Sequence, residues 1–306
     1  VRGEAETGLQ EVQEISVIRT WVLAARPKTL SAAIVPVMMA AALAARERTD
    51  TPWLYAALAL AGAVFIQIAT NFINDALDFK KGADTGERLG PLRVTQAGLI
   101  SAEAVMRAAM LCLFLAALCG IPLIYRGGWP MLIVGLLSIA MAYAYTGGPY
   151  PLAYKGLGEI FVILFFGLAA VGGTFYVLTL QLTRSALLAG FAAGSLATVL
   201  LVINNLRDVA SDRKSDKRTL AVRFGERFAL FEIVFFALAP FAAIAVIAWM
   251  QSHWWLLVVC AALPLAIALI VRCTRSRGAE LNRCLGLAGA LQWAVGILFA
   301  IGSVLG

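Results

Sequence analysis

The chain has 306 residues, of which 61% are hydrophobic and 14% charged, with a formal net charge of +7. Soluble domains are about 45–50% apolar, so this composition excludes an ordinary soluble protein and indicates an integral membrane protein. Basic loops facing an anionic leaflet explain the positive charge without a nucleic-acid partner. The single histidine, His253, excludes a histidine-based metal site, and the five cysteines lack metal-ligand spacing.

The apolar runs of the sequence are long enough to cross a membrane, which requires about 20 residues per helix. Residues 1–18 come first, and we expect this polar segment to be a disordered cytoplasmic tail before a single transmembrane domain at 19–306. The lipid core admits only helices or closed barrels. We therefore predict an all-α bundle of nine transmembrane helices in chain order: 21–45, 53–73, 102–124, 130–147, 159–180, 186–205, 228–250, 254–272 and 284–305.

The lysines and arginines predict how these helices are oriented. With a cytoplasmic N-terminus, the only basic residues outside are Arg46, Arg48, Arg126 and Arg184, out of 25 in the chain. The C-terminus is then outside. The long polar loops 74–101 and 206–227 both face the cytoplasm, and we expect the protein in the inner (plasma) membrane.

The second predicted helix ends in amide and carboxylate side chains. If the helix continues past residue 73, these side chains share one face by i, i+3 and i+4 spacing. They are Asn71, Asn74, Asp75 and Asp78. The sixth predicted helix ends in a stripe at i, i+4 spacing, formed by Asn204, Asp208, Asp212 and Asp216. The repeated Asn-x-x-x-Asp pattern suggests an internal duplication.

These two clusters predict a metal site. A polar helix end facing water would explain either cluster alone. However, stacked carboxylates repel one another unless a cation neutralises them, and the C-terminal end of a helix disfavours negative charge. Oxygen ligands favour a hard cation, and Mg²⁺ is commonly held by a few carboxylates plus substrate phosphates. Because basic residues accompany both clusters, we predict a site for Mg²⁺ and a diphosphate.

The same residues resemble the two motifs of the UbiA superfamily of intramembrane prenyltransferases, as Asn74-Asp75-x-x-Asp78 and Asp208-x-x-x-Asp212. The resemblance is closer to the menaquinone branch and covers nearly the whole chain, through segments 26–30, 78–85, 88–96, 145–149, 152–159, 204–208 and 217–225. Two positions depart from the pattern. Gly82 stands where the first motif usually has a further aspartate, for which Asp84 is a candidate substitute, and Ala76 stands where the branch often has tyrosine.

The resemblance implies a Mg²⁺-dependent aromatic prenyltransferase that joins polyprenyl diphosphate to 1,4-dihydroxy-2-naphthoate with loss of CO₂. It implies metal ligation by Asn74, Asp75, Asp78, Asp208 and Asp212. It implies catalytic roles for Asp84, Lys155 and Tyr145, and substrate binding by Lys28, Arg93, Tyr154 and Arg207. The positive-inside bias explains Lys28, Arg93 and Lys155 equally well, and interfacial anchoring explains the tyrosines.

Other functions remain open at this stage. Within the family, the acceptor could be 4-hydroxybenzoate, homogentisate, a haem or chlorophyll precursor, or a glycerol phosphate. A cation-coupled transporter would place its ionisable residues near the middle of the membrane. Here the carboxylates lie at the cytoplasmic ends of the predicted helices, which favours the enzyme.

Overall fold

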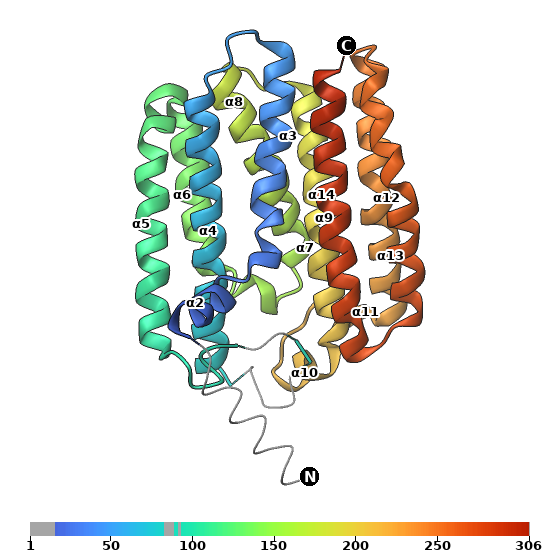
Figure 1. Cartoon of the computed structure of the whole chain (residues 1–306). Coiled ribbons are helices and arrows are strands. Elements are labelled where there is room, and N and C mark those ends of the chain that lie inside the picture. Colours follow the sequence, from blue (N-terminus) through green and yellow to red (C-terminus); the bar gives the residue numbers. More distant parts are fainter. Residues whose placement is uncertain (1–15, 83–88, 91–92, 306) are drawn as a thin grey trace.

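The computed structural model describes residues 16–82, 89–90 and 93–305, and within these ranges the chain is helical and contains no β-strand. Figure 1 shows the long helices side by side in one bundle, with α2 and α10 at one end and the end of α14 at the other. The long helices are α3 (Ser31–Glu47), α4 (Trp53–Lys80), α5 (Ala102–Gly127), α6 (Trp129–Ala144), α9 (Arg184–Arg207), α12 (Glu226–Met250), α13 (Leu263–Arg275) and α14 (Leu281–Val304).

Shorter elements complete or connect these helices. The short α-helices are α2 (Val17–Ala25), α7 (Gly158–Val162), α8 (Gly173–Thr179), α10 (Val209–Lys214) and α11 (Leu220–Phe224). A π-helix (Ile163–Gly172) joins α7 to α8. Segments of 3₁₀-helix lie at Pro27–Thr29, Leu152–Tyr154, Trp254–Ala262 and Gly278–Glu280.

Each predicted apolar run coincides with a helical segment. Among the described residues, seven of these segments are long and apolar enough to cross a membrane. The first run is a helix pair bent by 52°, which raises the number to eight if it forms one span. The run at α6 is a shorter apolar helix. The all-helical membrane fold is thus confirmed, while nine crossings remain a prediction.

The first run is also interrupted at Arg26, ahead of the 52° bend between Val17–Thr29 and Ser31–Glu47. Arg26 adopts a left-handed conformation (φ 52°) and Pro27 follows it, so the helix cannot continue. Asn71 on α4 donates from Nδ2 to the Ala25 carbonyl at 2.9 Å and to Thr29 Oγ1 at 3.0 Å. The Asn71 amide thus pairs with the Ala25 carbonyl, which the break leaves without a partner inside the helix. A membrane interior requires such polar groups to be paired within the protein. Asn71 therefore supports the interruption at Arg26.

α9 lies at the centre of the bundle, in contact with α12, α3, α14 and the π-helix. It meets the π-helix backbone to backbone. A Cβ added at Gly167 would lie 2.4 Å from the Gly190 carbonyl oxygen, and one added at Gly194 would lie 3.0 Å from the Ile163 Cα. Small residues permit this close approach, which is common between membrane helices. The crossing fixes α9, whose end carries the second aspartate cluster.

Side-chain hydrogen bonds link helix ends at the end of the bundle opposite α2 and α10, whose place Figure 1 shows. Arg126 donates from Nε to the Val177 carbonyl at 2.6 Å, and Gln251 donates to Ser185 Oγ at 3.1 Å. The His253 ring pairs through Nε2 with the Gly302 carbonyl at 2.7 Å. Segments that the charge distribution assigns to the outer side thus share one end of the bundle.

Candidate active site

α4 carries the first group of candidate ligands on its last turns. The helix continues without a break to Lys80, as predicted, and places Asn74, Asp75 and Asp78 along its polar end. Asp75 is 1% exposed, and its Oδ1 has no hydrogen-bond partner among the described residues. Asn74 accepts a hydrogen bond through Oδ1 from the Thr146 hydroxyl, which follows α6.

Asp78 is held by two residues that the sequence assigned to substrate binding. Arg93 Nη2 lies 2.9 Å from Asp78 Oδ2, and the side chains of this ion pair are 6% and 16% exposed, respectively. The Tyr154 hydroxyl donates to Asp78 Oδ1 at 3.1 Å. Charge-assisted hydrogen bonds of this kind are strong and directional. Arg93 and Tyr154 therefore fix the direction of the Asp78 carboxylate.

Lys81, one of the basic residues that follow the first cluster in the sequence, also belongs to this region. Its ammonium lies 4.7 Å from the centroid of the Tyr154 ring and donates to the Thr146 carbonyl. Desolvation lowers the pKa of Lys81, and the nearby Asp78 carboxylate opposes this shift. The position directly after the first motif was the available signal.

The second group lies across a helix break. α9 ends at Arg207, Asp208 is the residue between α9 and α10, and Asp212 lies within α10. The Asp212 N–H donates to the Asp208 carbonyl at 2.8 Å, so the two carboxylates keep roughly one-turn spacing. Both oxygens of Asp208 accept from the neighbouring Arg207, at 2.8 and 2.6 Å.

Asp212 is more buried than its neighbour. Lys217 Nζ lies 3.2 Å from Asp212 Oδ1, whereas Oδ2 is buried and has no hydrogen-bond partner among the described residues. Burial raises the pKa of Asp212, Lys217 opposes the shift, and the Asp208 and Asp78 carboxylates add to it. Asp78 of the first group therefore lies within electrostatic range of Asp212 of the second.

The predicted stripe on the second helix is wrong at its far end. Asp216 lies beyond α10, has a left-handed backbone (φ 52°), and pairs with Arg218 at the surface, where the Asp216 side chain is 82% exposed. Aspartate is a poor helix former and tolerates this conformation. At the other end of the stripe, the Asn204 amide donates to the Leu200 carbonyl one turn earlier. The second group thus consists of Asp208 and Asp212.

Tyr145 lies within electrostatic range of Asp78 of the first group and Asp212 of the second. Burial raises the pKa of its hydroxyl, and the Glu159, Asp78 and Asp212 carboxylates raise it further. A Cβ added at Gly158, the first residue of α7, would lie 3.2 Å from the Tyr145 oxygen. The hydroxyl thus lies against the start of α7 and remains protonated at neutral pH.

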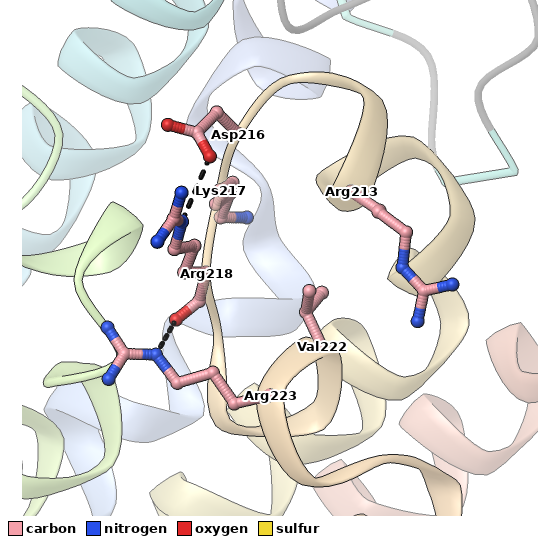
Figure 2. A pocket seen from close by; sticks show the side chains of 6 residues that line it. All are labelled: Arg213, Asp216, Lys217, Arg218, Val222 and Arg223. Carbon is pink, nitrogen blue, oxygen red and sulfur yellow. Dashed lines mark hydrogen bonds and ion pairs between the residues drawn. The ribbon is translucent and has the colours of Figure 1, made fainter.

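A basic cavity adjoins the second group. It has a volume of about 260 Å³, and its lining residues are Arg213, Asp216, Lys217, Arg218, Val222 and Arg223 (Figure 2). Arg223 donates from Nε to the Arg218 carbonyl at 3.0 Å, which steadies the wall. Lys217 both lines the cavity and pairs with Asp212. Such a basic wall suits a phosphate group.

Two predicted site residues, Lys155 and Lys28, are not brought against the carboxylates, and a third cannot be placed. Lys155 is exposed, and its ammonium lies 5.2 Å from the centroid of the Tyr150 ring. Lys28 is exposed on the 3₁₀-helix between α2 and α3. Neither lysine forms an ion pair with an aspartate in the part of the chain that the structure describes. Asp84 lies outside the described residues.

The two departures from the family pattern have structural explanations. Gly82 follows the end of α4 with a left-handed backbone (φ 67°), which glycine adopts without steric cost. Ala76 is fully buried in an apolar cluster with Phe72, Val94 and Val105. It therefore belongs to the packed face of α4.

The donor set fits a magnesium ion shared with a substrate. The described residues contain no group of three or more His, Cys, Asp or Glu side chains that could hold a metal ion. Asp75 Oδ1 and Asp212 Oδ2 are nevertheless buried carboxylate oxygens without a hydrogen-bond partner among these residues. Such oxygens are costly and point to a bound ion. Mg²⁺ commonly completes its shell with water and substrate phosphates.

Comparisons with known proteins give separate evidence on the family to which this chain belongs. A model of the UbiA prenyltransferase family matches residues 33–295. The 1,4-dihydroxy-2-naphthoate octaprenyltransferase of Mycobacterium tuberculosis is 38% identical over 285 residues, covering 92% of this chain and 96% of the relative. The protein of the same name from Escherichia coli is 41% identical over 220 residues, covering 70% and 71%, respectively.

Solved structures share the fold. The UbiA homolog from Archaeoglobus fulgidus bound to DMAPP and Mg²⁺ has a TM-score of 0.63 at 18% identity, covering 94% of this chain and 100% of that one. The homolog from Aeropyrum pernix has a TM-score of 0.69 at 16% identity, covering 89% and 97%. The fold and the family match together define a membrane-embedded prenyltransferase. The chain belongs to the UbiA prenyltransferase family.

Proposed function

We propose that the protein transfers a polyprenyl group from polyprenyl diphosphate to 1,4-dihydroxy-2-naphthoate, with loss of CO₂ and diphosphate, and so forms demethylmenaquinol for menaquinone biosynthesis. One observation carries the proposal. The relatives from Mycobacterium tuberculosis and Haemophilus influenzae, both named 1,4-dihydroxy-2-naphthoate octaprenyltransferase, are 38% and 34% identical and match more than nine-tenths of this chain.

The proposal includes a topology. The domain at 19–306 crosses the inner membrane nine times after a cytoplasmic tail at 1–18, with the active site at the cytoplasmic face. The distribution of lysine and arginine supports this orientation. Both carboxylate groups lie at the end of the bundle where α2 and α10 are found (Figure 1).

Asn74, Asp75, Asp78, Asp208 and Asp212 would hold the magnesium. When bound, Mg²⁺ supplies positive charge that makes the diphosphate a better leaving group. Lys217 and Lys81 add positive charge on either side, one beside Asp212 and the other beside Tyr154. Preorganised charge of this kind lowers the barrier to breaking the allylic C–O bond.

The remaining residues orient the site. Arg93 and Tyr154 hold Asp78, and Arg207 holds Asp208, so these three act through the carboxylates. Tyr145 keeps its proton and lies within electrostatic range of both groups, so its aromatic ring would stabilise an allylic cation. We further propose that the exposed Lys28 binds the acceptor carboxylate, that Lys155 binds the diphosphate, and that Asp84 accepts a proton.

The proposal is tested with purified protein in lipid nanodiscs, polyprenyl diphosphate and dihydroxynaphthoate labelled in its carboxyl group. We expect labelled CO₂ and a prenylated product in equal amounts, loss of turnover with EDTA, and recovery with Mg²⁺. Turnover with only 4-hydroxybenzoate or homogentisate would overturn the acceptor assignment. Turnover unaffected by EDTA would overturn the metal assignment.

A further inference from the structure

Asn282 joins the second aspartate group to the chain that follows the first. It is the second residue of α14, far along the sequence from both motifs. Its Oδ1 accepts from Arg207 Nη1 at 2.8 Å, and its Nδ2 donates to the Leu89 carbonyl at 2.7 Å. One amide therefore contacts two segments that the helices bring together only in the folded bundle.

The first of these contacts orients Asp208. The Arg207 side chain is 1% exposed, and its guanidinium is planar with donors in a fixed fork. Nε and Nη2 donate hydrogen bonds to the two oxygens of Asp208, while Nη1 donates to Asn282. The bond from Nη1 to Asn282 fixes the plane of the Arg207 guanidinium. It thereby fixes the direction in which Asp208 presents its remaining lone pairs.

The second contact reaches the chain beyond the first motif. Leu89 precedes Arg93 by four residues, and Arg93 holds Asp78. The Leu89 side chain also lies beside the 3₁₀-helix Gly278–Glu280 that precedes α14, because a Cβ added at Gly278 would be 3.5 Å from the Leu89 Cδ1. The bond from Asn282 therefore anchors Leu89, four residues before the arginine that holds Asp78.

The chemistry of the two contacts selects an amide. The side chain must accept from a guanidinium with one atom and donate to a carbonyl with the other. An aspartate would keep the first bond but would place an acceptor against the Leu89 carbonyl. A leucine of similar shape would lose both.

We propose that Asn282 is a positioning residue that sets the Arg207–Asp208 pair for the metal–diphosphate complex and ties it to the segment bearing Arg93. This inference rests on the proposed function of the two aspartate groups. Residues that orient metal ligands from outside the first layer typically change metal affinity or activity by about 10–100-fold when they are replaced.

The test compares Asn282→Leu and Asn282→Asp with a control on the same helix, Gln292→Leu. Gln292 is fully buried and accepts through Oε1 from Ser31 Oγ at 2.8 Å, so its loss also breaks a helix-to-helix hydrogen bond. The readouts are the Mg²⁺ concentration for half-maximal turnover, and the rise in unfolding temperature caused by Mg²⁺ with inorganic diphosphate.

We expect Asn282→Leu to raise the half-maximal Mg²⁺ concentration about tenfold or more and to reduce the ligand-induced rise in unfolding temperature. Asn282→Asp, which keeps the Arg207 contact, should show a smaller change in both. Gln292→Leu should lower the basal unfolding temperature but leave both readouts unchanged. If Asn282→Leu does not fold, Asn282→Asp and Asn282→Gln carry the comparison.

The inference is overturned if the Asn282 variants keep the wild-type Mg²⁺ response, or if Gln292→Leu changes that response as much as they do. Failure of the proposed acceptor is a separate result. A wild-type protein that does not prenylate dihydroxynaphthoate, yet is stabilised by Mg²⁺ and diphosphate only when Asn282 is present, would support the positioning role alone.

Discussion

The two carboxylate groups are built in different ways. The first lies on an unbroken helix, and Asp78 is held by residues 15 and 76 positions away in the sequence. The second lies across a helix break, and its ion pairs come from its own segment, one and five positions away. The first group is therefore assembled by the tertiary fold, whereas the second is largely organised by local sequence. Distant substitutions should disturb the first group more readily.

The largest expected effect tests whether both groups are needed. Asp78→Asn and Asp208→Asn should each lower kcat by about 10²–10³-fold or more, because each removes charge that the metal–diphosphate complex requires. The exposed Asp216→Asn is the matched control and should stay within about twofold of the wild type. Equal losses in all three variants would indicate a general charge effect.

The second prediction compares the partners of the two groups. Arg93→Leu leaves Asp78 without its cation in a nearly buried site, which typically costs about 3–5 kcal/mol. Lys217 is 24% exposed, so water compensates part of its loss, and Lys217→Leu should cost about 1–2 kcal/mol. Unfolding temperatures of the two variants, measured in the same detergent, show which substitution costs more stability. A larger loss for Lys217→Leu would reverse our comparison.

The third prediction concerns pH. The lowered pKa of Lys81 means that its ammonium loses a proton at a lower pH than a free lysine does. Turnover should therefore fall as the pH rises through this pKa. In Lys81→Arg this alkaline limb of the pH profile should move to higher pH, since arginine stays charged. Tyr145→Phe should lower the rate without moving the limb, because the raised pKa keeps Tyr145 protonated throughout.

The same shift has a consequence for stability. Between the folded-state and unfolded-state pKa values of Lys81, the unfolded chain binds more protons than the folded chain. The folded state therefore gains stability as the pH rises through this window. Thermal unfolding of Lys81→Met across the same pH range should lack this gain.

The smallest expected effect is at Gly82. Gly82→Ala should cost about 1 kcal/mol, because the position has a positive φ. Gly82→Asp restores the aspartate that is usual in the superfamily, yet we expect no gain in turnover, since the residue lies beyond the end of α4. Increased activity of Gly82→Asp, measured at limiting Mg²⁺, would show that this position reaches the metal.

The sequence predicted the features that depend on composition and local spacing. Long apolar runs predicted the helices, and i, i+3 and i+4 spacing predicted the polar face of α4. The π-helix leaves no comparable pattern, because close packing against α9 supports it. The interruption at Arg26 was not predicted although Pro27 follows it, and a hydrogen bond from Asn71 on α4 supports it.

The partners within the site were harder to predict. Arg93 was identified as a cation of the site, but its contact with Asp78, 15 residues earlier, depends on the tertiary fold. Asn282 has no motif and enters the site only because α14 begins beside Arg207. Asp216 shows the opposite error, since regular spacing continued in the sequence after the helix had ended.

The contact of Gly167 with Gly190 and Gly194 also limits how this protein can evolve. Where side chains meet, a substitution on one helix can be offset by a smaller residue on its neighbour. Here main chain contacts main chain, so the facing helix has no side chain that a smaller residue could replace. A mutational scan should therefore find these glycines intolerant both singly and in combination, with no second-site suppressor on the opposite helix.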